Sequence, residues 1–342
     1  ENMLCHENIA SRSIIYESYD KQVQGRTISE AGESDSGVLA PFNSDDYPKE
    51  IQKTGIALST DHNPRYGIID PYLGGINSVV EAMRNVAAVG ATPHAISDCL
   101  CFGNPENPNQ MWEFVESVRG VAEACNQIKL KHNQKHPTPI IAGNVSFYNE
   151  SKSGAIPPSP IVSCLGKLEN IDKTISMSFK KENSTILMLG LRKNEMGGSL
   201  FYQLNNELGA NVPNPDLNEV KKQIYAITDC IDQSLLNSCH DISDGGLAVA
   251  LAEMSFKNEI GFDIKIKQDY NDGVLLFSET GGFVLETDND NINHVENIFN
   301  KYNLNFQNIG KTNNSSILRI NESINLELKK AKTLWENGLR NK

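Results

Sequence analysis

The sequence predicts an α+β protein of two domains. Its 342 residues amount to about two domains at roughly 150 residues each. Strand-like and helix-like segments are interspersed along the whole chain, which favours mixed α and β structure in both parts. The run Pro157-Pro158-Ser159-Pro160 is the strongest linker signal, so we expect domains at residues 1–157 and 158–342.

The first domain is expected to hold two amphipathic helices between short strands. Ile76, Val79, Val80 and Met83 recur at helical spacing, and Gly90 stands where a C-cap glycine belongs. The elements predicted in order are a short helical pattern near 14–19, strand 56–58, a turn at 70–75, helix 76–89, strand 95–102, helix 112–127, a loop insertion at 129–136 and strand 139–142.

The second domain restarts the same kind of pattern after the proline run. Strands and helices again follow one another, and no repeat of 20–50 residues is visible. The elements predicted in order are strands 161–166 and 185–191, helices 217–238 and 246–256, strands 262–266 and 281–286, helix 291–302, strand 317–320 and a final helix 326–339.

Charge and composition exclude several classes of partner. The formal net charge is −12 and the pI about 5.1, and no basic patch stands out, so we expect no nucleic-acid partner. No apolar stretch of about 18 residues predicts a membrane span, and residues 1–16 lack a secretory pattern. The seven cysteines, an odd number, fit reduced thiols in the cytoplasm. Cys99 and Cys101 would share a strand face without bridging.

Two polar segments follow predicted strands. In the segment 143–150, Gly143 allows close backbone approach to a ligand, while Asn144 and Ser146 alternate onto one face. They can offer an amide oxygen to Mg²⁺ and a hydroxyl to a phosphate. A plain strand end with turn residues is the alternative. In the segment 98–106, Asp98 either reaches a nucleotide or its metal, or is simply solvated.

Two further segments place polar groups on or before helices. Glu81 and Asn85 lie four residues apart, so they share a helix face and can both ligate Mg²⁺, although an exposed pair is the alternative. In the segment 240–248, Ser243 or Asp244 can cap the following helix, whose N-terminus can bind an anion. We favour a hydrogen-bonded structural role for His240 over a catalytic one.

Together these motifs resemble phosphoribosylformylglycinamidine synthase (FGAM synthase) subunit II, of de novo purine biosynthesis. The segments 61–66, 70–75, 85–91, 98–106, 143–150 and 240–254 stand in the order of that family, and the resemblance spans nearly the whole chain. The chain is most similar to the second of the enzyme's two pseudo-symmetric halves. The wider superfamily includes aminoimidazole ribonucleotide synthetase.

The resemblance implies an ATP- and Mg²⁺-dependent C–N ligase. Such enzymes convert formylglycinamide ribonucleotide (FGAR), ATP and ammonia into FGAM, ADP and phosphate. It also implies a sheet-rich N-terminal domain that pairs with a counterpart sheet, and an α/β C-terminal lobe. Asp98 and Gly143 would contact ATP, Asn144 would bind Mg²⁺, and Ser146 would contact the ribonucleotide substrate.

Longer relatives hold a second, non-reacting nucleotide in a mirror-related site, and the resemblance extends to its ligands. In this chain the Mg²⁺ ligands of that site would be Asp35, Glu81, Asn85 and Asp241, with Ser243 near the nucleotide.

The departures from the family pattern define the expected partners. The first half's histidine-bearing catalytic segment is not found, so we assign no catalytic residue, and Cys125 lies in a helix pattern rather than on a nucleophile turn. We therefore expect the first half of the synthase and a separate glutamine amidotransferase as partners, and a homodimer when the chain is alone. Two alternatives stay open: a homodimeric enzyme like aminoimidazole ribonucleotide synthetase, and a non-catalytic ADP-binding scaffold.

Overall fold

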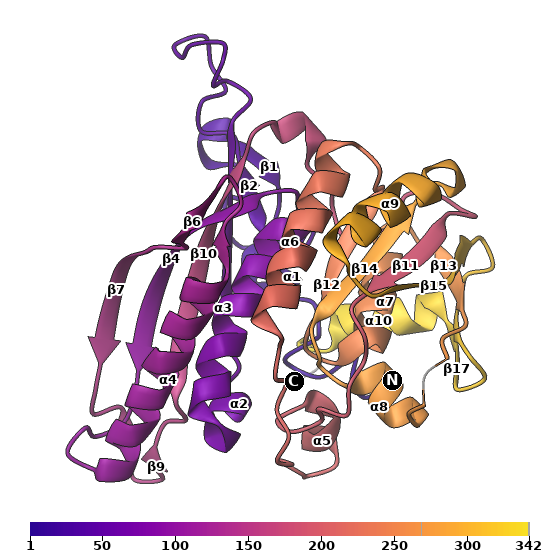
Figure 1. The fold of residues 1–342 in the computed structure, drawn as a ribbon. Helices are drawn as coiled ribbons and strands as arrows, with labels where there is room; N and C mark the ends of the chain where they lie inside the picture. The colour runs from indigo at the N-terminus through magenta and orange to yellow at the C-terminus, as the bar shows by residue number, and fades with distance from the viewer. Residues whose placement is uncertain (268, 341–342) are drawn as a thin grey trace.

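The computed structural model describes residues 1–267 and 269–340 (Figure 1). Its strands are β1 (Thr27–Ser29), β2 (Gly37–Leu39), β3 (Gly55–Asp61), β4 (Thr92–Cys101), β5 (Lys129–Leu130), β6 (Asn133–Pro137), β7 (Ile140–Ser146), β8 (Glu150–Ser151), β9 (Gly154–Ala155), β10 (Ser159–Leu168), β11 (Thr185–Leu189), β12 (Ser238–Ile242), β13 (Gly261–Ile264), β14 (Gly282–Thr287), β15 (Phe306–Asn313), β16 (Ile317–Ile320) and β17 (Ile324–Glu327). Its α-helices are α1 (Ser13–Tyr16), α2 (Pro64–Ile69), α3 (Pro71–Ala88), α4 (Pro108–Gln127), α5 (Leu200–Leu204), α6 (Leu217–Asp232), α7 (Gly246–Phe256), α8 (Asp272–Phe277), α9 (Ile292–Tyr302) and α10 (Leu328–Asn337).

Two large sheets organise the molecule and confirm the α+β prediction. The six-stranded sheet has the order β1-β2-β3-β10-β4-β7, and the seven-stranded sheet has the order β12-β14-β11-β15-β13-β16-β17. Helices α3, α4, α6 and α9 lie between the two sheets, where they share one continuous apolar core (Figure 1). Helices α7 and α10 cover the far face of the second sheet in a separate core.

The far face of the first sheet carries apolar side chains, and no helix within residues 1–267 and 269–340 covers it. Leu39 of β2 and Leu58 of β3 are 46% and 53% exposed. Val38 and Ala57, which alternate with them, are fully buried against the helices. An exposed apolar sheet face is typical of a surface that another protein covers.

Helix α3 begins earlier than the sequence indicates, so the predicted turn at 70–75 is wrong. Asp70 accepts a hydrogen bond from the backbone nitrogen of Leu73, and Pro71 occupies the first helical position. Gly75 suits the contact with α4, because a Cβ there would lie 2.3 Å from the carbonyl oxygen of Ser117. These residues look like turn residues but serve as a cap and a close helix contact.

The proline run is not the boundary between the two sheets. Strand β10 begins at Ser159 and pairs with both β3 and β4 in the first sheet. The first sheet therefore extends to Leu168, rather than ending at the expected residue 157. A proline at the start of a strand is tolerated, and Pro160 occupies such a position.

One other prediction needs correction, and the N-terminal segment has a place that the sequence did not predict. The expected loop at 129–136 is a small hairpin of β5 and β6. The N-terminal residues Met3, Leu4 and Ile9 are buried in the second core, and the Ser11 nitrogen donates to the Trp335 carbonyl. The start of the chain thus packs on the second sheet.

Most of the strongly patterned elements are confirmed. The helices predicted at 76–89, 112–127, 246–256 and 291–302 correspond to α3, α4, α7 and α9. The helix predicted at 217–238 ends at Asp232, because its last residues turn into β12. Within the described residues, no helix is both long and apolar enough to cross a bilayer.

The contact between α3 and α4 gives a first prediction. A Cβ at Gly120 would lie 2.0 Å from the Tyr72 carbonyl oxygen, which is backbone and cannot easily move. Gly120→Ala should therefore lower the free energy of unfolding by about 1–3 kcal/mol, although alanine is the better helix former by about 1 kcal/mol. Denaturant unfolding measures the change. Asn126→Ala on an exposed position of the same helix should stay within about 0.5 kcal/mol. Equal effects of the two variants would contradict the tight contact.

Candidate functional site

A cluster of carboxylates lies between the two sheets, beside α3. Asp61 ends β3, and the amide nitrogen of Asn85 on α3 donates to both Asp61 oxygens at 3.1 Å. Glu81 lies one helical turn before Asn85 and is affected by the charges of Asp61 and Asp241. The structure therefore brings the expected ligands Glu81, Asn85 and Asp241 together around Asp61.

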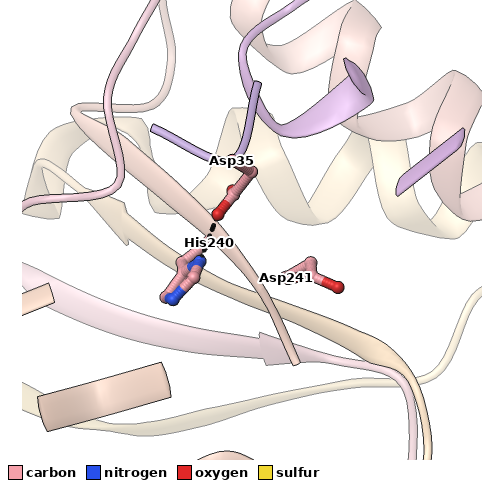
Figure 2. A group of neighbouring side chains, drawn as sticks. All are labelled: Asp35, His240 and Asp241. Carbon is pink, nitrogen blue, oxygen red and sulfur yellow. Dashed lines mark hydrogen bonds and ion pairs between the residues drawn. The ribbon is translucent and has the colours of Figure 1, made fainter. Parts of the chain in front are cut away.

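Asp35 completes this group from the other side of β12. Figure 2 shows Asp35, which precedes β2, pointing toward His240, with Asp241 next along the same strand. One ligand atom of each of these three residues lies within 4.8 Å of the other two. Successive strand residues point to opposite faces, so His240 and Asp241 turn toward different sides of β12.

His240 is a buried, doubly hydrogen-bonded residue, as favoured from the sequence. Its Nδ1 lies 2.5 Å from Asp35 Oδ1, and its Nε2 lies 3.1 Å from Glu253 on α7. The indole nitrogen of Trp335 in turn donates to Glu253. Burial opposes the positive charge on His240, but the two carboxylates outweigh it and raise the pKa of His240 well above its usual value. His240 thus holds Asp35 in place.

Two carboxylate oxygens in this cluster have no hydrogen-bond partner among the residues that the structure describes. They are the buried Oδ2 atoms of Asp35 and Asp241. Arg84 Nε lies 3.6 Å from Asp241 Oδ2, which makes an ion pair without a hydrogen bond. Buried polar atoms are nearly always satisfied in proteins, so these oxygens indicate a missing ligand.

The pKa values of the carboxylates in this cluster are raised by burial and by their mutual repulsion. Burial, followed by the charge of Asp241, raises the pKa of Asp61 to about 7. Burial also raises the pKa of Asp241 to about 6, although Arg84 opposes that rise. The pKa of Glu81 lies well above its usual value because of burial and the charges of Asp61 and Asp241. Each shift reflects the cost of ionising a carboxylate that lies away from water among like charges.

The donor set fits a hard divalent cation. Carboxylate and amide oxygens are the ligands that Mg²⁺ prefers, and two of the carboxylate oxygens are unused. Asp35, Glu81, Asn85 and Asp241 would hold such an ion, with Asp61 as a ligand not foreseen from the sequence. A cation here would neutralise the like charges that raise these pKa values.

Ser243 lies beside this cluster but does not cap the helix that follows. Its hydroxyl donates to Asp241 Oδ1 at 3.3 Å. The N-cap of α7 is Gly245, which has a φ of 78° and makes no side-chain capping bond. The expectation that Ser243 or Asp244 caps this helix is therefore wrong, because two consecutive glycines make the turn instead.

A cleft of about 530 Å³ opens onto the carboxylate cluster. Its walls include Asp35, Asp61 and His240, together with Trp335 near the C-terminus and the N-terminal segment 8–12. The volume is within the range of small-molecule binding sites. The N-terminal segment thus contributes Arg12 to a site whose acidic groups lie more than twenty residues further along the chain.

The second set of expected site residues lies at the end of β4 and on the edge strand β7. These strands pair in parallel, with Asp98 opposite Gly143 and Cys101 opposite Ser146. A Cβ at Gly143 would lie 2.4 Å from Asp98 Oδ1, so glycine leaves room for this carboxylate. Burial raises the pKa of Asp98.

Strand alternation divides this set between the two faces of the sheet. Asp98 and Gly143 share the face that carries α4, whereas the amide nitrogen of Asn144 donates to Cys99 Sγ at 3.4 Å on the other face. Cys99 and Cys101 share that face, with their sulfurs 3.6 Å apart. Ser146 pairs with Cys101 there and bonds to Asn149. The four residues lie together, but a ligand must reach around the edge of β7 to contact all of them.

The two sets lie in one row across the first sheet. Val162 of β10 is paired with Asp61 on one side and with Asp98 on the other. Neighbouring strands are about 4.8 Å apart, so the backbones of the two aspartates are separated by about 10 Å. A single strand therefore fixes the spacing of both groups.

Sequence reasoning missed several buried polar residues of this region. Glu279 accepts hydrogen bonds from the Tyr66 hydroxyl and from the backbone nitrogens of Leu200 and Gly245. Burial, followed by the charge of Asp244, raises the pKa of Glu279 to about 8. Tyr66 lies in one of the recognised motifs, but nothing in the sequence pairs it with a carboxylate 213 residues away.

The raised pKa of Asp61 gives a pH-dependent prediction. The folded protein binds this proton more tightly than the unfolded chain, so the resulting stability is present below about pH 4 and is lost as pH rises to about 7. In EDTA, the wild-type Tm should therefore fall from pH 5.5 to 8 more steeply than that of Asp61→Asn. Saturating Mg²⁺ at pH 8 should raise the wild-type Tm by about 5 °C and leave the variant unchanged. Thermal unfolding at both pH values measures this.

Asp45→Asn is the matched control, because Asp45 is exposed in the segment between β2 and β3 and is not one of the cluster residues. It should follow the wild type in both pH dependence and Mg²⁺ response. A wild-type Tm that does not respond to Mg²⁺ at pH 8 would exclude the carboxylate cluster as a cation site.

Comparison with known proteins identifies the family. Residues 34–168 match AIR synthase related protein, N-terminal domain, and residues 181–321 match AIR synthase related protein, C-terminal domain. The phosphoribosylformylglycinamidine synthase subunit PurL of Methanothrix thermoacetophila is 44% identical over 345 residues. That alignment covers 99% of this chain and 44% of the relative, so the chain spans less than half the length of that protein.

Solved structures show the same fold at low sequence identity. Thermotoga maritima PurL complexed with ATP has a TM-score of 0.70 at 17% identity, covering 97% of this chain and 51% of that one. The same protein complexed with FGAR also has a TM-score of 0.70 at 17% identity, covering 90% and 49%. The chain therefore belongs to the AIR synthase related protein family, and it carries both the N-terminal and the C-terminal domain of that family.

Proposed function

We propose that the chain supplies one half of an FGAM synthase, in which ATP drives the amidation of FGAR to FGAM in purine biosynthesis. The observation that carries this proposal is the 44% identity to a PurL subunit across nearly the whole chain. The neighbouring structures of PurL with ATP and with FGAR support both ligands. By the resemblance, this half is the second of the two.

The proposed reaction transfers the terminal phosphoryl group of ATP to the amide oxygen of FGAR. Ammonia then attacks the activated carbon, and phosphate leaves, so that FGAM, ADP and phosphate are formed. Mg²⁺ would neutralise the charge of the triphosphate. The demands on the protein are to hold nucleotide and substrate in contact and to exclude water.

In this proposal the end of β4 and β7 contributes to the reacting site. Asp98 occupies the space left by Gly143, so a nucleotide whose metal meets this carboxylate would also lie close to the backbone of Gly143. Asn144 uses its amide nitrogen in the contact with Cys99, so its amide oxygen is the atom available to Mg²⁺. Ser146 offers a hydroxyl to the ribonucleotide substrate. All four residues lie at the edge of the sheet, where a second polypeptide can close the site.

The carboxylate cluster is proposed to hold the second, non-reacting nucleotide through Mg²⁺. Asp35, Glu81, Asn85 and Asp241 would ligate the metal, and Ser243 would lie near the nucleotide. The 530 Å³ cleft beside them supports this assignment. Its acidic lining favours a metal-bound nucleotide over the free anion, because unscreened phosphates would be repelled.

The proposed partners rest on the relatives that the chain matches and on its exposed sheet. The apolar face with Leu39 and Leu58 is the surface on which we propose that the other half of the synthase packs. A second copy of this chain would cover that face when the other half is absent. Ammonia would come from a glutamine amidotransferase subunit. All seven cysteines are free, which fits a reducing cytoplasm.

Reconstitution tests the proposed function. The part of the Methanothrix thermoacetophila relative that this chain does not match is expressed separately and mixed with it, with ammonium as the nitrogen source. FGAM formation from FGAR and ATP should require both polypeptides. Strong FGAM synthesis by this chain alone would contradict the half-enzyme assignment. Formation of aminoimidazole ribonucleotide from FGAM by the chain alone would instead identify the homodimeric alternative.

Asn144→Ala in the reconstituted enzyme should lower kcat/KM by about tenfold or more, because it removes a polar contact to the charged metal-nucleotide group. Asn133→Ala is the matched control, because this asparagine lies exposed on β6. Equal activity of the two variants would remove Asn144 from the site. Tightly bound ADP without turnover in the mixture would favour the scaffold alternative.

A further inference from the structure

Two free thiols converge on the far face of the first sheet, close to the end of β4. Cys99 and Cys101 are half-buried, and their sulfurs lie 3.6 Å apart. The Cα atoms of residues two apart on a strand are separated by about 6.6 Å, so both side chains lean toward each other. Cys99 is paired with Ile161 of β10, which lies on the same face as Leu58. The far face therefore presents two sulfur atoms side by side.

The backbone of β4 is held on both sides at these positions. Cys99 lies between Ile161 of β10 and Asn144 of β7 in the sheet. A disulfide brings the sulfurs to about 2.0 Å and seldom spans a Cα separation above about 6.8 Å, which an extended strand already approaches. Closing that bond would shorten β4 between two strands that are paired with it. The two sulfurs are therefore better placed to hold an ion between them than to be joined.

The spacing of the sulfurs matches that of two thiolates on one metal ion. With Zn–S bonds of about 2.3 Å and tetrahedral angles, two thiolates on a zinc ion lie about 3.8 Å apart. The 3.6 Å between Cys99 and Cys101 agrees with this to about 0.2 Å, the tolerance expected of a metal site. Thiolates select ions such as Zn²⁺, whereas Mg²⁺ prefers oxygen ligands. The pair thus differs in chemistry from the carboxylate cluster.

Asn144 adds a third donor beside the two sulfurs. Its side-chain amide contacts Cys99 Sγ at 3.4 Å. The nitrogen and the oxygen of an amide have nearly the same shape, so a half-turn about the last side-chain bond would direct the oxygen toward an ion at the sulfurs. Ser146, two residues further along β7, is already bonded to Asn149. Three protein ligands and one position for water form the arrangement of an open zinc site.

We propose that Cys99, Cys101 and Asn144 bind a thiophilic divalent cation of the zinc type. The ion replaces the two thiol protons, which pass to the solvent, and neither sulfur is oxidised. The family resemblance assigns no role to either cysteine, so the site goes beyond the proposed synthase activity. Asn144 is shared with the proposed reacting site, so a thiophilic ion would compete there with Mg²⁺. That consequence rests on the proposed function, whereas the binding itself does not.

Cadmium is the probe, because thiolate-to-cadmium charge transfer gives an ultraviolet absorption that carboxylate ligands do not give. Cd²⁺ is titrated into the whole chain with a phosphine reductant, without nucleotide, and with saturating Mg²⁺ to fill the carboxylate cluster. The wild type should show an absorption that saturates at one equivalent, and Zn²⁺ should remove it by competition. Cys99→Ser and Cys101→Ser should each weaken Cd²⁺ binding by about tenfold or more, because each variant loses a thiolate ligand.

Cys5→Ser is the matched control, because Cys5 is likewise a half-buried free thiol but lies in the N-terminal segment. It should bind Cd²⁺ like the wild type. Cys101→Ala replaces a serine variant that fails to fold, and it should weaken binding equally. The proposal is overturned if the wild type gives no saturable absorption, or if both variants of the pair bind Cd²⁺ as the wild type does. Each outcome concerns the isolated chain, so it is independent of FGAM synthesis, which the reconstitution measures separately.

Discussion

The burial of several like charges in the layer between the sheets is the constraint on which the rest of the structure depends. Asp61 comes from one part of the chain and Asp241 and Asp244 from another, and burial raises the pKa of each. Such a group is stable only where protons, arginines or bound cations offset the repulsion. Arg84 provides one permanent positive charge, 3.6 Å from Asp241. A bound cation would therefore offset the remaining repulsion between these buried carboxylates.

Helix α3 packs in the core between the two sheets and also carries residues of the carboxylate cluster. Its small residues allow close approach to α4, while its polar face carries Glu81, Arg84 and Asn85 into the carboxylate cluster. A polar face buried in a helix core is destabilising unless its groups are paired, and Asn85 is paired with Asp61. The helix thus links the packing of the core to the chemistry of the site.

The sequence allowed prediction of those parts of the molecule that local patterns determine. The apolar spacing of α4 and the i, i+4 relation of Glu81 and Asn85 are local, and both were predictable. Strand β12 was not, because all five of its residues are buried and it has no alternation to reveal it. The start of β10 looked like a linker, because proline signals a break whether or not the next residues pair, whereas residues 161–166 were predicted as a strand. The roles of Asp61 and Glu279 depend on contacts between distant segments, which no local pattern encodes.

Asp61, Val162 and Asp98 lie in one row, so the position of β10 sets the distance between the two groups of ligand residues. Strand pairing has a side-chain period of two, so a shift of β10 by one residue would turn Val162 and Cys164 out of the core. The apolar packing of this strand therefore holds the two acidic positions at a fixed interval. An evolutionary change that shifted the register of β10 against one of these aspartates would therefore also shift it against the other.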